Sequence, residues 1–104
     1  MTLQQFETAL KQAVPETYKV AAPKGEQRYV AWHTFGRDST FGDNRNQMDF
    51  PRVQLDIITN NPDDFIVDDV CAALWAMDLP YSVESEGYDD NYAAYRTILQ
   101  LVVA

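Results

Sequence analysis

The residues that could perform acid–base chemistry are few in this chain. His33 is the only histidine, and Asp56 and Asp43 are the acids that could act as its partners. One imidazole with carboxylates nearby is the minimum for general acid–base catalysis. This gives one hypothesis, a small ligand-binding or enzymatic domain that uses His33 and Asp56 beside the loop carrying Asp43. His33 has no second ligand at metal-binding spacing, so the pattern favours a hydrogen-bonded strand residue.

Two further groups of acidic and amide residues suggest metal chemistry, and neither completes a known pattern. The first group consists of Asp63, Asp64, Asp68 and Asp69. The positive end of a helix dipole explains the acids at 63 and 64, and a solvated helix face explains those at 68 and 69. The second group, Asp43, Asn44 and Asn46, lacks the alternating acids, the central glycine and the closing glutamate of a calcium loop. We therefore predict no metal, no cofactor and no enzymatic activity.

Composition and charge narrow the class of protein. The 104 residues suit one domain, 1–104, with a single core. The net charge of −8 repels the nucleic-acid backbone, so we expect no sequence-specific nucleic-acid binding. The single cysteine, Cys71, cannot form an internal disulfide. We find neither a secretion signal nor a membrane-spanning run, which predicts a protein made in the cytoplasm without membrane contact.

The apolar spacing predicts two helices and about five strands. Thr2 and Gln5 form a capping box for a helix over 3–13, and a second helix is expected to begin at Pro62 and to end before Pro80. Strands are expected over 17–22, 28–35 and 52–58, and then in two segments between 81 and 103 around a turn. The order αβββαββ predicts an α+β fold, with a mostly antiparallel sheet and both helices packed on one face.

Two features indicate assembly with other subunits. Apolar side chains fall on both faces of the 28–35 strand, which includes Trp32, and the second face has too few elements left to cover it. Phe41 is a large apolar residue in the polar, turn-rich loop over 36–46, where it either anchors the loop against its own fold or contacts a partner chain. We therefore expect subunit contacts on the uncovered sheet face and in this loop.

Several short motifs, spread over nearly the whole chain, give a resemblance to a known family. They are MTLQxF at the N-terminus, YVAW at 29–32, FGD at 41–43, VQLDI at 53–57, an Asn-x-x-Asp helix start within 60–64, and YAAYR at 92–96. Together they resemble the small tail terminator, or tail completion, proteins of long-tailed (siphovirus-type) phages and their prophages. The family carries an aromatic residue, a small residue and an aspartate in its loop, in the place of Phe41, Gly42 and Asp43.

The resemblance implies a structural virion protein of the tail, assembled in the host cytoplasm. It implies a homo-oligomeric ring, a hexamer, that caps the tail tube, ends its polymerisation and offers a surface for head–tail joining. The implied partners are further copies of the chain, the tail tube protein and a head connector or head-closure protein, with DNA passing through the ring. The expected assembly interface consists of Trp32, Phe41, Gly42, Asp43 and Arg45. A head-closure or other minor tail or connector protein is the alternative interpretation.

Overall fold

The computed structural model describes residues 1–39 and 49–104, with the side chains of 37–39 and 49 left aside. Its elements are α1 (Leu3–Ala13), β1 (Thr17–Lys19), β2 (Tyr29–Ser39), β3 (Asp49–Thr59), α2 (Ile66–Ala76), β4 (Tyr81–Asp89) and β5 (Ala94–Val102). The strands form one sheet in the order β1-β2-β3-β5-β4, in which only β1 and β2 pair in parallel. The predicted αβββαββ order and the α+β class are confirmed.

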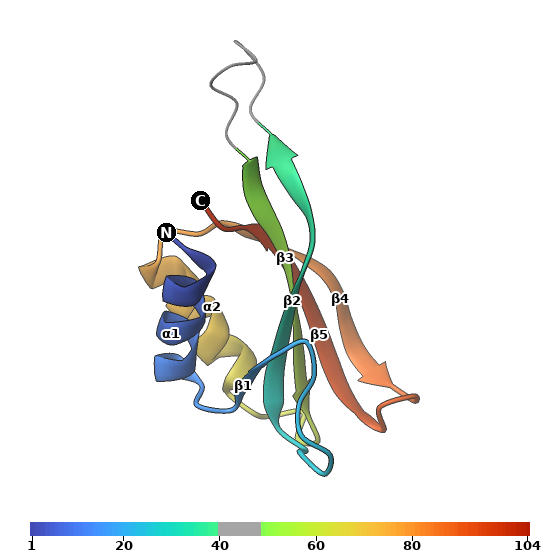
Figure 1. Cartoon of the computed structure of the whole chain (residues 1–104). Helices are drawn as coiled ribbons and strands as arrows, with labels where there is room; N and C mark the ends of the chain where they lie inside the picture. The colour runs from blue at the N-terminus through green and yellow to red at the C-terminus, as the bar shows by residue number, and fades with distance from the viewer. Residues whose placement is uncertain (40–48) are drawn as a thin grey trace.

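Both helices lie on the same side of the sheet, as Figure 1 shows. α1 begins as predicted, because Thr2 Oγ1 accepts a hydrogen bond from the Gln5 backbone N–H at 3.0 Å, and Gln5 Oε1 accepts one from the Thr2 N–H at 2.8 Å. Its Phe6 and Leu10 are fully buried against the sheet. Burial of each contributes about 1.5–3 kcal/mol relative to exposure, which holds this short helix in place.

The core lies between the helices and the side of the sheet that faces them. The strands alternate, so every second residue of β3 (Val53, Leu55 and Ile57) faces this core, and Leu99 and Leu101 of β5 lie beside them. From α2 the core receives Ile66, Val70 and Leu74. The opposite side of the sheet carries polar side chains, among them Gln54, Asp56, Arg96 and Gln100.

The second helix starts later than the sequence pattern predicts. It begins at Ile66, and Pro62 lies in a turn that precedes it. The reason is that Asp64 uses one carboxylate oxygen to accept the Ile66 N–H at 3.0 Å and both oxygens to bind Arg28. The acids of the first helical turn are therefore Asp68 and Asp69. Asp63 and Asp64 do not belong to the helix.

The end of α2 is a Schellman motif. The Leu79 N–H donates to the Leu74 carbonyl oxygen at 3.0 Å, and the Asp78 N–H donates to the Trp75 carbonyl oxygen at 3.0 Å. Asp78 itself has a φ of 59°, the left-handed conformation that this position requires. The chain then turns directly into β4, the edge strand beyond β5.

Candidate functional site

Trp32, the first residue of the expected interface, is a core residue. Its side chain is 2% exposed, and its ring meets the Phe6 ring edge to face, with centroids 5.8 Å apart. Its indole N–H donates to Glu7 Oε2 at 3.0 Å. The sequence places Trp32 with Val30 on one face of β2, and the structure places α1 over that face. This correction removes Trp32 from the candidate interface.

The other four expected interface residues are Phe41, Gly42, Asp43 and Arg45. They lie outside the described residues. The strands that lead into this segment are described, and they form an arm. After a shift in register between Thr34 and Gly36, β2 pairs with β3 through Arg37, Asp38 and Ser39. The pairing of β5 with β3 ends at Arg52, and β1 pairs with β2 only as far as Trp32.

The end of the β2–β3 hairpin is therefore a two-stranded arm that extends past its neighbours, at the end of the molecule opposite the start of α2 (Figure 1). At its base the Arg52 guanidinium lies over the Phe35 ring, 4.5 Å from the centroid, and Phe35 remains 38% exposed. A two-stranded ribbon without further strands beside it is only marginally stable in water. The arm would therefore gain stability from contact with another protein surface.

A network of polar side chains crosses the open face of the sheet. Gln100 donates to Gln54 Oε1, and Gln54 donates to Asp56 Oδ1, over 3.2 and 3.1 Å. The Arg96 guanidinium then donates to both Asp56 and Asp89, at 3.2 Å each. The network covers this face with polar groups, and its acids neutralise the Arg96 guanidinium, although Arg96 Nε is buried without a hydrogen-bond partner. The alternation along each strand indicates that these side chains share one face of the sheet. Only the register between the strands brings them into contact.

The charge pairs in this network also set the protonation of Asp89. Burial favours the neutral carboxyl, but hydrogen bonds from Arg96 and from backbone N–H groups, including that of Asn91 at 2.8 Å, outweigh it. The pKa of Asp89 is lowered as a result. The Arg96 guanidinium also lies over the Tyr92 ring, 4.6 Å from its centroid. Arg96 thus holds β3, β5 and the end of β4 together.

The acid–base hypothesis receives no geometric support on this face. His33 pairs across the strands with Gln54, while the Asp56 carboxylate is engaged by Gln54 and Arg96. Asp43, the third member, lies outside the described residues. Within residues 1–39 and 49–104, no three His, Cys, Asp or Glu side chains gather closely enough to hold a metal ion. The described geometry does not assemble a catalytic pair from His33 and Asp56.

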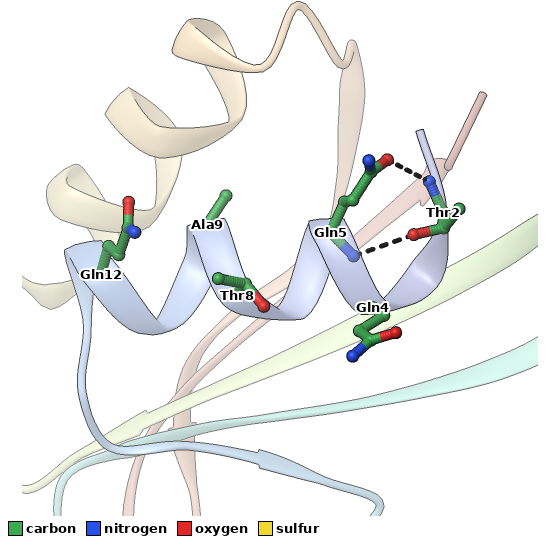
Figure 2. A pocket seen from close by; sticks show the side chains of 6 residues that line it. All are labelled: Thr2, Gln4, Gln5, Thr8, Ala9 and Gln12. Carbon is green, nitrogen blue, oxygen red and sulfur yellow. Dashed lines mark hydrogen bonds between the residues drawn. The ribbon is translucent and has the colours of Figure 1, made fainter.

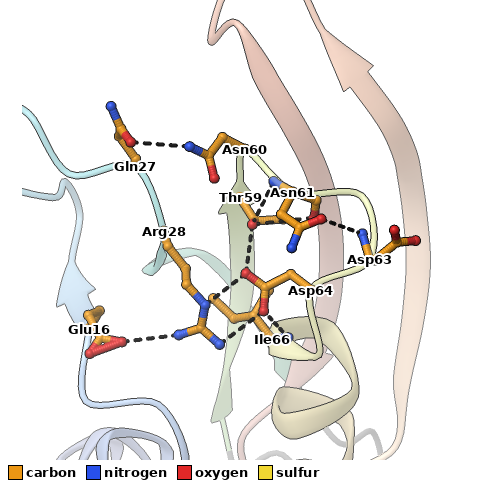
Figure 3. Close-up of polar contacts among 9 residues, drawn as sticks. All are labelled: Glu16, Gln27, Arg28, Thr59, Asn60, Asn61, Asp63, Asp64 and Ile66. Atoms are coloured by element: carbon orange, nitrogen blue, oxygen red, sulfur yellow. Dashed lines mark hydrogen bonds and ion pairs between the residues drawn. The ribbon is translucent and has the colours of Figure 1, made fainter.

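The most tightly organised polar cluster is one that the sequence pattern does not predict. Arg28 donates to both oxygens of Asp64, through Nε at 2.8 Å and through a terminal nitrogen at 3.0 Å, as Figure 3 shows. The Thr59 hydroxyl also donates to Asp64, at 2.7 Å. Arg28 reaches Glu16 on its other side, at 3.2 Å. The cluster ties the start of β2 to the turn before α2, which is a structural role.

The electrostatics of this cluster follow from its hydrogen bonds. The Arg28 guanidinium lowers the pKa of Asp64, and the Thr59 hydroxyl and the Ile66 N–H act in the same direction. Asp64 in turn raises the pKa of Arg28. No local sequence signal could have revealed this pair, because its members stand 36 residues apart. Only the fold brings them into contact.

A shallow hollow on the outer surface of α1 is lined by Thr2, Gln4, Gln5, Thr8, Ala9 and Gln12 (Figure 2). All of these residues belong to one helix and its cap, and none is charged. Thr2 and Gln5 are already engaged with each other in the capping box. The hollow contains no convergent set of functional groups, so we assign it no ligand.

The edge strand β4 is the largest uncovered element. Every residue from Tyr81 to Tyr88 is exposed, although β4 pairs with β5 over its length. Its Tyr81 and Val83 lie in register with Leu101 and Leu99 of the core face, and they are 38% and 52% exposed. The apolar face of the sheet thus continues beyond the area that the helices cover. The sequence predicts these strands, but it does not predict which strand the helices leave uncovered.

Comparisons with known proteins add no relative. No protein-family model matches the chain, and no curated protein matches its sequence. In the described residues, no helix is long and apolar enough to cross a membrane. The resemblance to tail completion proteins therefore remains a prediction that rests on the residues quoted above.

Proposed function

We propose that the chain is a structural protein of a phage tail, a tail terminator or completion subunit that forms a homo-oligomeric ring, with six subunits as the expected number. The ring caps the tail tube, ends its polymerisation and provides the head–tail joining surface. The observation that carries the proposal is the β2–β3 arm, because its last described residue pairs, Asp38 with Phe50 and Ser39 with Asp49, have no other described strand beside them. The arm is the element that we expect to contact the neighbouring subunit.

Two further observations support a role in assembly. The motifs quoted from the sequence span the chain, and the α+β order that the apolar spacing predicts is present. The charge of −8 also suits a ring through which DNA passes, because an acidic lumen does not bind the phosphate backbone. In this role the protein belongs to the virion tail and is assembled in the host cytoplasm. Its partners are the tail tube protein and the head connector.

A matched pair of variants tests the role of the arm. Phe35 lies at the base of the arm, and Phe65 follows the opposite end of β3; their exposed fractions are 38% and 72%. We expect Phe35→Ala to reduce the ring fraction in size-exclusion chromatography with light scattering, with and without purified tail tubes. Phe65→Ala should leave it unchanged, because the same side chain is lost far from the arm. Equal effects of both substitutions would contradict the role of the arm.

Electron microscopy of tails made without the protein tests the function itself. We expect tubes of uncontrolled length that fail to join heads. Tubes of normal length that fail only at joining would instead support the alternative, a head-closure or connector protein. A strict monomer at every concentration, together with normal tails and normal joining, would refute both assignments.

A further inference from the structure

Among the strands that the structure describes, none lies beside the outer edge of β4. β4 spans nine residues, Tyr81–Asp89, and it is the last strand of the sheet, so the backbone groups on its outer side have no partner strand. In Figure 1 it lies at the margin of the sheet, beyond the helices. An exposed edge of this kind is a template on which an extended polypeptide can pair. Soluble proteins usually protect such an edge, often with lysine side chains.

β4 carries no basic side chain of its own to protect this edge, although Arg52 of β3 borders the hollow that Glu84 lines on the open side. The chain contains no Lys, Arg or His between residues 53 and 95, a stretch that includes all of α2 and β4. The same stretch contains ten acidic residues: Asp56, Asp63, Asp64, Asp68, Asp69, Asp78, Glu84, Glu86, Asp89 and Asp90. Three of them, Asp56, Asp64 and Asp89, are neutralised by Arg28 or Arg96. The flank formed by α2 and β4 is therefore strongly negative.

The apolar side chains beside these acids give the edge a surface to bury. Tyr81, Val83 and Tyr88 of β4 are 38%, 52% and 57% exposed. Cys71 of α2 raises the pKa of Tyr81, which places this side of the helix next to β4. Trp75 follows Cys71 by one helical turn on the same side and is 87% exposed. Apolar surface thus lines the helix side of the edge.

The charge pattern decides what can occupy the edge. A second copy paired through its own β4 would bring two acidic strands together, with no basic side chain on either, and opposed like charges destabilise a sheet. An extended segment that alternates apolar and basic residues would bury the tyrosines and Val83 on the helix side, while its cations lie on the open side beside Glu84, whose carboxylate accepts a hydrogen bond from Ser82 there. We propose that the outer edge of β4 binds such a basic segment of a partner protein as an additional strand. The proposal does not depend on ring formation.

The test uses the full chain and a synthetic nine-residue peptide that alternates valine and lysine, matching the length of β4. Two control peptides carry glutamate in place of lysine, or N-methyl groups on alternate backbone nitrogens. Fluorescence anisotropy measures affinity, and amide chemical shifts of the labelled protein locate the site. We expect the lysine peptide alone to bind, with shifts concentrated over 81–88. Its affinity should fall as salt increases, because exposed charges are screened.

A matched pair of protein variants separates local from general charge effects. Glu84 lies on β4, and Glu26 lies in the connection before β2; both are exposed. Glu84→Lys should weaken binding by about threefold, a typical value for exposed charges, and Glu26→Lys should not. The proposal is overturned if the lysine peptide fails to bind, if either control peptide binds equally well, if both variants have equal effects, or if the shifts fall outside β4. It is also overturned if β4 pairs with a second copy.

Discussion

The contact between Arg28 and Asp64 allows a quantitative prediction. Asp64→Asn removes the negative charge from a carboxylate that is 12% exposed and that accepts two hydrogen bonds from Arg28, one from Thr59 and one from the Ile66 N–H. A hydrogen bond to a charged group contributes about 1.5–3 kcal/mol net. The Arg28 side chain is 41% exposed, so solvent screens part of the interaction. We expect the free energy of unfolding to fall by about 2 kcal/mol.

The other partner of Arg28 supplies a matched control. Glu16 reaches the same guanidinium at 3.2 Å, but its side chain is 36% exposed. Glu16→Gln also removes one negative charge, and such an exposed pair contributes less than about 1 kcal/mol. Urea unfolding followed by circular dichroism measures both variants. In a domain of this size the loss at Asp64 corresponds to a fall in Tm of about 10 °C.

The pH dependence gives the same contact an independent test. The pKa of Asp64 is lowered in the folded state, so this group binds its proton more readily in the unfolded chain. Its contribution to stability is therefore fully present above the unfolded pKa of about 3.9 and is lost as the pH falls through the folded pKa. The stability difference between the wild type and Asp64→Asn should shrink below about pH 4. A difference that stays constant from neutral to acidic pH, or equal losses in Asp64→Asn and Glu16→Gln, would refute this account.

Three further substitutions test the core, the helix end and the surface. Trp32→Phe should lower the free energy of unfolding by about 1–3 kcal/mol in urea titrations, because it removes the hydrogen bond to Glu7 and core volume, yet it should leave the oligomeric state unchanged. Asp78→Gly should raise that free energy by about 0.5–1 kcal/mol, because φ is 59° there and the aspartate lies at the negative end of the α2 dipole. Asp78→Asn is the control that isolates the effect of the charge. If neither variant gains melting temperature, the assignment of this helix end is wrong. Trp75→Ala should change the stability of the isolated chain by less than about 0.5 kcal/mol, since its side chain is 87% exposed, and a large loss in the same titration would show that Trp75 packs in the fold.

The sequence determined the local structure and the order of the elements. The Thr2–Gln5 capping box forms as predicted, because its contacts lie within four residues of the chain. The alternation in β3 correctly predicts which side chains face the core, because the strand period of two fixes it. The αβββαββ order follows from these local signals together, and it restricts the fold to a mostly antiparallel sheet with helices.

The tertiary structure decided what those elements contact. Both faces of β2 carry apolar residues, so the sequence could not tell that α1 covers the face with Trp32 and removes this residue from the surface. Arg28 pairs with Asp64 although 36 residues separate them in the sequence. Because of this pair, α2 starts at Ile66 and not at the predicted Pro62. The exposure of β4 depends on strand order and on how far the helices reach. These are contacts between distant segments, which no local pattern of residue types encodes.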